Sequence, residues 1–236
     1  ISDMLLAKFS LGENEVLVNL DVFFRLDEVS GLAGMASHEV LQAVLVHESV
    51  HAIDDSIVSL AKLEELIVDV DSSQTINALM EGHAQFWARR VCDARGWSAA
   101  FEHFTNAIAF VPEADDPVSE IMMSSFAAQL SFWYEEGERF FLAVHAAKGE
   151  EGVREVFQAP PTEPVLISQP DWYLDPSSRP EAEFDLEERL GVIIDLSSQS
   201  DRTMSKMKLL KPQIAAGLAL LPAVEVESVL AELQDN

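Results

Sequence analysis

The residues best suited to chemistry form one short run, HESVH, at positions 47–51. His47 and His51 are four residues apart, so on a helix their imidazoles lie one turn apart on the same face and can bind one Zn²⁺ at about 2.0–2.1 Å. Glu48 is not placed as a ligand, but its carboxylate is suited to accept a proton from a water molecule at such a metal. The pattern H-E-x-x-H therefore predicts a zinc site with its general base.

A third protein ligand is needed, and its identity separates the classes of zinc peptidase. The metzincin extension requires Gly at position 54 and His or Asp at position 57, where this chain has Asp54 and Ile57. The gluzincin solution is a glutamate from a following helix. Glu81, in NALMEGHAQFW, is the candidate, and its neighbour Gly82 would let two helix backbones approach closely. The alternative for Glu81 is an ordinary exposed helical glutamate.

With HESVH and EGHA both present, the chain resembles a family of bacterial zinc proteases related to thermolysin-like gluzincins, in which H-E-x-x-H is followed by an E-G-x-A helix. The resemblance extends to Tyr134, Gly137 and Phe140 in YEEGERF and to PPTEPVLISQPDWY, so it covers roughly residues 37–175. It implies a zincin-like fold, a Zn²⁺ cofactor and zinc-dependent hydrolysis of peptide bonds.

Gluzincins also use a tyrosine or histidine to stabilise the oxyanion that forms during hydrolysis. Tyr134 is the first candidate, with His145 and Tyr173 behind it, although a tyrosine packed in a long helix is an equally good interpretation of Tyr134. In the family a histidine often precedes the later proline, whereas this chain has Gln169 at that position.

Two further polar residues lie at helical spacing from the expected ligands, and a third, His83, does not. Asp55 follows His51 by four residues and Gln85 follows Glu81 by four, so both are candidates to orient ligand imidazoles, or else ordinary polar helix residues. His83 lies about 200° round the helix from Glu81, and we expect it to have a structural or surface role.

Two helices must position these residues. Apolar residues recur at helical spacing over 37–56 and over 72–95. For the second helix, Asp71 and Gln74 are spaced as a capping box and Gly96 is the expected stop. We expect the two helices to lie side by side.

The distance between the motifs requires a break between these helices. An unbroken helix over 47–70 that turned back at once would put His51 ~19 residues before the turn and Glu81 ~11 after it, a mismatch of about 12 Å. One metal ion cannot bridge that distance. We therefore expect a break after the polar residues 54–56, with 57–70 forming a separate packed segment.

The rest of the chain predicts a mostly helical α+β fold with a short strand region near the amino terminus. The expected elements are one or two strands in 15–24, helices over 97–111, 118–148 (ending at Gly149), 150–158, 181–194 and 213–234, a proline-rich loop over 159–180 and a hinge over 196–206. We expect a zincin-like domain over 1–195 and a helical extension over 196–236, which can pack as part of the same domain.

Composition excludes several classes of partner. With 236 residues, 48% of them hydrophobic, the chain can bury a sizeable core. Its 41 acidic and 15 basic residues give a charge of −26, which disfavours nucleic acid and anionic membranes. This charge either attracts cationic substrates or forms a solvated acidic surface.

The lone Cys92 excludes an internal disulfide, and the longest apolar run, 214–224, is too short to span a membrane.

We therefore expect a peptide or protein substrate, no nucleic-acid partner and no membrane insertion. Because the sequence begins at Ile1, we expect that the original amino terminus is missing, so the absence of a signal peptide says nothing about compartment. A bacterial periplasmic or secreted location is favoured over a cytoplasmic one.

Two other functions compete with peptide hydrolysis. A catalytically inactive zincin-like module could keep the fold and the metal but act as a scaffold, and Gln169 is the main support for it. A di-iron carboxylate bundle would use Glu48 and His51 as half of its site. That bundle needs a second E-x-x-H, and the chain has none.

Removing zinc should lower the melting temperature, because binding to the folded state alone adds RT ln(1 + [Zn]/Kd) to stability. The chain should nevertheless stay folded and cooperative, since its core is far larger than that of a zinc finger. Thermal melting followed by circular dichroism, with and without a chelator, measures both effects. Loss of helical signal at room temperature would indicate a structural site, and unchanged melting would indicate no specific site.

Overall fold

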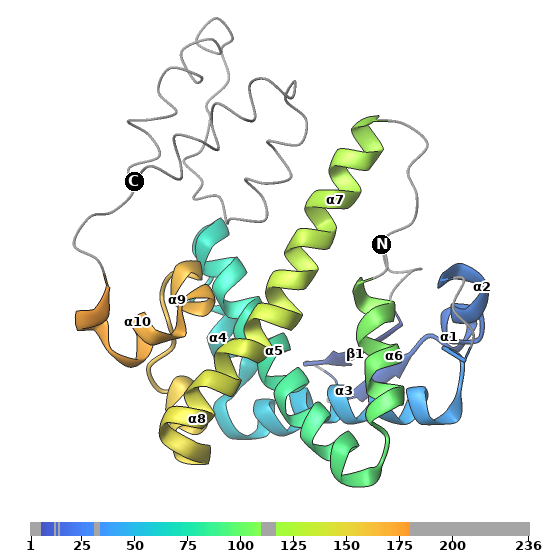
Figure 1. Ribbon diagram of the computed structural model, residues 1–236, viewed down its shortest axis with the longest axis horizontal. Helices are drawn as coiled ribbons and strands as arrows, with labels where there is room; N and C mark the ends of the chain where they lie inside the picture. The colour runs from blue at the N-terminus through green and yellow to red at the C-terminus, as the bar shows by residue number, and fades with distance from the viewer. Residues whose placement is uncertain (1–5, 12, 14, 31–33, 110–116, 180–236) are drawn as a thin grey trace, which may run out of the picture.

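The computed structural model describes residues 6–11, 13, 15–30, 34–109 and 117–179. Over these ranges the protein is mostly helical with one small two-stranded sheet, which confirms a predominantly helical α+β class (Figure 1). The elements in chain order are β1 (Ala7–Ser10), β2 (Glu15–Val18), α1 (Leu20–Phe24), α2 (Leu26–Ser30), α3 (His38–Val58), α4 (Leu60–Glu64), α5 (Val70–Arg95), α6 (Ser98–Ala109), α7 (Pro117–Ser131), the π-helix η2 (Phe132–Glu136), α8 (Gly137–Val156), α9 (Pro164–Ser168), α10 (Pro170–Leu174) and the 3₁₀ helix η3 (Pro176–Ser178).

Several predictions fall outside these residues. The helices expected over 181–194 and 213–234, the hinge over 196–206 and the boundary between 195 and 196 all lie outside the described part of the chain. Among the described helices, none is both long enough and apolar enough to cross a membrane.

Helix α3 carries the H-E-x-x-H pattern and ends where the spacing argument requires a break. Ser37 caps its first turn by accepting a hydrogen bond from the Val40 N–H. The helix stops at Val58, and Ser59 turns the chain with a positive φ of 56°. The next residues form the separate short helix α4, so the expected break is confirmed, although it falls after Val58 rather than after residue 56, and residue 70 already belongs to α5.

Helix α5 begins earlier than the sequence predicts. Its cap is Asp69, whose carboxylate accepts the Ser72 N–H at 2.8 Å, while the Ser72 hydroxyl accepts the Asp69 N–H at 2.9 Å. The predicted Asp71 and Gln74 box is therefore wrong, because the extended residue before the helix is Asp69. The stop at Gly96 is confirmed by its left-handed conformation, φ 77°.

The strand region near the amino terminus is shorter than predicted, and its first strand was missed. Strand β2 pairs antiparallel with β1, with Phe9 opposite Val16. The prediction that strand continues to residue 24 is wrong beyond Val18. Asn19 accepts a hydrogen bond from the Val22 N–H, and this cap starts helix α1 instead.

The long helix expected over 118–148 is interrupted by a π-helical turn. Helix α7 ends at Ser131, η2 follows, and α8 continues from Gly137. The predicted stop at Gly149 is confirmed by its non-helical backbone, with φ 68° and ψ −162°, and the short helix expected over 150–158 follows it as far as Val156. Figure 1 shows α7 projecting beyond the other described helices.

The proline-rich segment is not the loop that was predicted. It contains two short helices and a 3₁₀ turn, and each starts with a proline in its first turn. Proline is well suited to this position because its fixed φ is helical and its missing N–H is not needed there.

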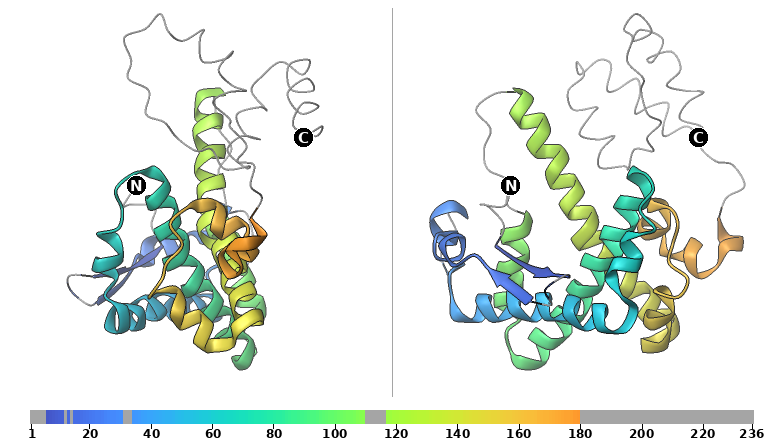
Figure 2. Two further views of the ribbon diagram at one scale, coloured as in Figure 1. Left: turned by 90° about the vertical axis from the view of Figure 1, so that its left-hand side faces the viewer. Right: turned by 180° about the vertical axis from the view of Figure 1, so that it is seen from behind.

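Helix α5 lies at the centre of the fold, where it packs against α3 and against η2 and α8 (Figures 1 and 2). It contributes to two buried apolar clusters. Ala88 and Cys92 join a cluster with α3 and α6, whereas Leu79 and Phe86 join a cluster with η2, α8 and α9. The same helix therefore fixes the positions of the elements on both sides.

The two helices α5 and α8 approach most closely at a pair of glycines. A Cβ atom placed on Gly82 would lie 2.2 Å from the backbone of Gly137, and one on Gly137 would lie 2.3 Å from the Ala78 carbonyl oxygen. Both distances are far inside van der Waals contact. The expectation that Gly82 permits close helix packing is confirmed.

Substituting Gly82→Ala should destabilise the protein by at least about 3 kcal/mol, because two backbones must separate to admit one methyl group. In an unhindered helix the same change would be stabilising by about 1 kcal/mol. Gly96→Ala is the matched control: nothing lies within 4 Å of its Cβ position, so only the positive φ is strained and the cost should be about 1 kcal/mol. Urea unfolding measures both, and equal losses would contradict the close-contact explanation.

Candidate metal centre

Three side-chain atoms from two helices converge on one point. The Nε2 atom of His47 lies 3.2 Å from His51 Nε2 and 3.2 Å from Glu81 Oε2. The remaining side of the triangle, from His51 Nε2 to Glu81 Oε2, is 3.4 Å. The structure therefore brings together all three residues predicted as metal ligands, and the group can hold a metal ion.

The size of this triangle fits zinc. Ligand atoms at about 2.0–2.1 Å from a tetrahedrally coordinated Zn²⁺ lie about 3.3–3.4 Å apart. The three measured distances, 3.2, 3.2 and 3.4 Å, agree with that spacing. Two imidazole nitrogens and a carboxylate oxygen are donors that zinc accepts, and three protein ligands leave a fourth position for water or substrate.

The triangle is assembled by the packing of α3 on α5. The two histidines project from one face of α3, and Glu81 projects from α5 opposite them. The His47 ring is held edge-on by Phe104 of α6 at 5.4 Å and stacked on Tyr134 of η2 at 5.8 Å, measured between ring centroids. Aromatic contacts on two sides therefore limit the movement of the first ligand.

The charges of the three ligands are coupled. Burial raises the pKa of Glu81, but the His51 and His47 imidazoles outweigh it and hold the pKa well below its usual range. Burial lowers the pKa of His51, and the Glu81 carboxylate outweighs that effect so that the pKa is raised. The Glu81 carboxylate is thus kept ionised, which is the form that binds a cation.

Glu48 lies on the same helix and is only 7% exposed. Burial raises its pKa, while the imidazoles of His47 and His51 oppose that rise. A carboxylate with a raised pKa is a better general base near neutral pH than an exposed one. The structure thus places Glu48 beside the ligands without making it one of them.

Strand β1, which the sequence analysis missed, supplies a backbone partner for Glu48. The Phe9 N–H lies against the Glu48 carboxylate and lowers the pKa of Glu48, against the larger effect of burial. The Leu6 carbonyl accepts the Asn19 N–H, so by antiparallel alternation the Phe9 N–H points away from β2. No side-chain pattern could reveal this contact, because a backbone group makes it.

Tyr134 is the one of the three predicted oxyanion donors that reaches the ligands. Its hydroxyl lies against the Glu81 carboxylate, and burial, together with that carboxylate, raises the pKa of Tyr134 further above the usual value. The hydroxyl therefore remains protonated and able to donate. Tyr134 sits in the middle of the π-helix η2, and such turns are frequent at functional sites.

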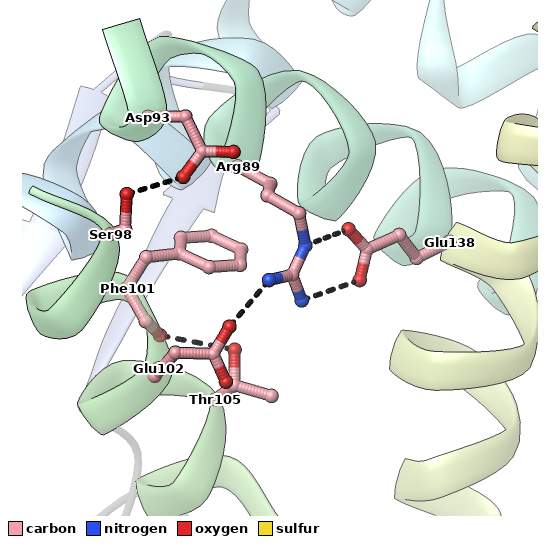
Figure 3. Close-up of polar contacts among 7 residues, drawn as sticks. All are labelled: Arg89, Asp93, Ser98, Phe101, Glu102, Thr105 and Glu138. Carbon is pink, nitrogen blue, oxygen red and sulfur yellow. Dashed lines mark hydrogen bonds and ion pairs between the residues drawn. The ribbon is translucent and has the colours of Figure 1, made fainter. Parts of the chain in front are cut away.

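An ion-pair cluster fixes the helix that carries Tyr134. Arg89 of α5 donates from two nitrogens to Glu138, one turn beyond Tyr134, and from a third to Glu102 of α6 at 2.5 Å (Figure 3). Its guanidinium also lies 4.7 Å from the centre of the Phe101 ring. Hydrogen bonds to Glu138 raise the Arg89 pKa above its usual value. This cluster ties α6 and α8 to α5 beside the candidate metal centre.

A second buried polar network joins α3 to α5. The Trp87 indole N–H donates to His83 Nε2 at 2.9 Å, so the His83 proton lies on Nδ1, which donates to Asp54 at 2.7 Å. His83 is buried between the rings of Phe141 and Phe157. These contacts give His83 a structural role, which is one of the two roles expected for it. Its partner Asp54 was not predicted.

Four other predicted residues do not reach the ligands. The Asp55 carboxylate accepts the Leu60 N–H at 2.9 Å and so caps α4. The Tyr173 hydroxyl donates to the Ala159 carbonyl at 2.9 Å, and His145 packs on Phe86. Gln169 is exposed between α9 and α10.

Gln85, the other residue suggested to orient a ligand, is buried on α5 one turn after Glu81. Its Oε1 atom and His47 Nδ1 are buried and have no hydrogen-bond partner within the part of the chain that the structure describes. Buried polar atoms without partners are rare in folded proteins.

Comparison of the chain with protein-family models, with curated proteins and with solved structures finds no match. The resemblance to gluzincins therefore stays a prediction based on the motifs.

Asp54→Ala should destabilise the protein by about 1–3 kcal/mol, because the His83 N–H would stay buried without an acceptor. Asp54→Asn should cost clearly less, since an amide oxygen can still accept that hydrogen bond. Chemical unfolding in the presence of a chelator measures both variants apart from any effect of metal. Equal losses for the two variants would show that the hydrogen bond contributes nothing.

Proposed function

We propose that the protein binds Zn²⁺ through His47, His51 and Glu81 and hydrolyses peptide bonds with Glu48 as the general base. The observation that carries this proposal is the convergence of three ligand atoms at 3.2–3.4 Å from one another. An ordinary surface glutamate at position 81 would have no reason to meet two histidines of another helix. The gluzincin interpretation of the sequence requires Glu81 to converge with the two histidines.

In the proposed reaction, the metal, Glu48 and Tyr134 have separate roles. Bound zinc would polarise the scissile carbonyl and lower the pKa of a water molecule in its open position. Glu48 accepts the proton of the attacking water and passes it to the leaving amine. The Tyr134 hydroxyl, which stays protonated, donates a hydrogen bond to the oxyanion as negative charge develops there.

A zincin-like fold is part of this proposal. Two features of the described residues support it: the side-by-side packing of the two motif helices and the strand that lies beside Glu48. We also propose that the substrate is a peptide or protein, because two histidines and one glutamate are the donor set of zinc peptidases.

A second candidate is a metal-binding module without turnover. It is favoured by two contacts that occupy catalytic groups, namely the Phe9 N–H on Glu48 and the Tyr134 hydroxyl on Glu81. The exposed position of Gln169 removes one further source of an oxyanion donor. The two candidates agree on the metal and differ only in catalysis.

Glu48→Gln should retain one zinc per chain and lose about 10²–10⁴-fold in turnover, because an amide of the same size cannot accept the proton. His51→Ala should lose both zinc and turnover. Zinc content by elemental analysis and digestion of a broad peptide library, with and without chelator, measure the two properties separately.

The outcomes distinguish the candidates. Wild-type protein that binds zinc but digests no peptide would favour the inactive module. A Glu48→Gln protein that digests peptides at the wild-type rate would exclude Glu48 as the base. Wild-type protein that binds no more zinc than His51→Ala would contradict the site itself.

A further inference from the structure

The two unpartnered buried atoms at the candidate centre lie on facing helices. His47 Nδ1 belongs to α3 and Gln85 Oε1 belongs to α5, and their residues are 2% and 1% exposed. Leaving a buried polar atom without a hydrogen bond costs about 1–3 kcal/mol. Two such atoms near one site therefore need an explanation.

The packing of α3 on α5 sets these residues opposite each other. Later in α3, His51 meets Glu81 of α5. Earlier in α3, Val44 shares a buried cluster with Ala88, which comes later in α5. The two helices therefore pass each other in opposite directions.

His47 and Gln85 are the residues between these two levels. His47 is four residues before His51, and Gln85 is four residues after Glu81, so each lies on the face that its helix turns to the other. Both side chains are buried in this contact. Helical register thus places Gln85 of α5 at the level of His47 of α3.

Metal binding at Nε2 would require the Nδ1 atom of His47 to carry the proton and to donate it to an acceptor. The Nε2 atom of His47 is the one that points to Glu81 and His51. A neutral imidazole that gives its Nε2 lone pair to a cation must carry its proton on Nδ1, and a buried N–H requires an acceptor. An amide oxygen such as Gln85 Oε1 is a suitable acceptor.

We propose that Gln85 is a positioning residue of the metal centre, whose side-chain oxygen accepts a hydrogen bond from His47 Nδ1 when Nε2 holds the metal. The inference rests on the metal site of the proposed function but not on peptide hydrolysis. One hydrogen bond satisfies both unpartnered atoms, fixes the His47 tautomer and holds the ring in line with the other ligands.

Other polar side chains near the ligands already accept hydrogen bonds. The carboxylate of Asp54 accepts from His83, and that of Asp55 accepts from the Leu60 N–H. The rings of Phe104 and Tyr134 flank the His47 ring. Among the buried side-chain atoms of the described residues, Gln85 Oε1 is the one acceptor without a partner, and helical register places its residue opposite His47.

The decisive variant is Gln85→Met, which keeps the shape and removes the acceptor. Zinc affinity, measured by competition with a chromophoric chelator, should fall about 10–100-fold. The melting temperature in excess chelator should stay the same or rise, because an unsatisfied oxygen has been removed. A residue with only a structural role would give the opposite pattern.

Two control variants sharpen the test. Gln74 is also buried on α5, but its Oε1 accepts the Trp133 N–H at 2.9 Å. Gln74→Met should therefore lower the melting temperature and leave zinc affinity within about twofold. Gln85→Glu keeps an oxygen acceptor and should bind zinc within about threefold of wild type, or more tightly.

A spectroscopic signature completes the experiment. Nitrogen-correlated NMR of the zinc-loaded protein should show a protected His47 Nδ1–H signal in wild type and Gln85→Glu, beside the His83 Nδ1–H signal that every variant keeps, and Gln85→Met should lose the His47 signal alone. Wild-type affinity in Gln85→Met would overturn this inference and leave the metal site intact. Failure of the wild-type protein to bind zinc would overturn both.

Discussion

The packing of α5 against α3 on one side and α8 on the other is the constraint on which the candidate centre depends. One face of α5 carries Glu81 to the two imidazoles of α3. The next residue, Gly82, lies against Gly137 with no room for a side chain. Both contacts belong to adjacent residues of one rigid helix. Any shift of α5 would therefore distort the ligand triangle and displace Tyr134 at the same time.

Buried polar pairs keep these helices in register. Arg89 joins α5 to Glu138 of α8, and His83 joins it to Asp54 of α3. Such pairs add little net stability, but in a low-dielectric interior a misplaced partner is costly, so they favour one arrangement over its neighbours. The ligands are therefore held by a surrounding network that is itself fixed, as an effective metal site requires.

The sequence predicts the parts of the site that depend on local spacing. The i, i+4 pair of histidines, the break before residue 60 and the stop at Gly96 all follow from helical geometry and capping. The missed features are nonlocal: the Phe9 N–H reaches Glu48 through strand pairing, and Asp54 meets His83 only because two helices cross. The π-helix that carries Tyr134 has no reliable sequence signal, since it depends on packing around it.

X-ray absorption at the zinc K-edge, on protein loaded with one equivalent of Zn²⁺, shows whether two imidazoles and one carboxylate of this chain hold one zinc ion. We expect nitrogen and oxygen neighbours at about 2.0–2.1 Å, the outer-shell pattern of two imidazoles and a coordination number near four. An octahedral oxygen shell without imidazole, which a surface of charge −26 could provide by nonspecific binding, would exclude this ligand set.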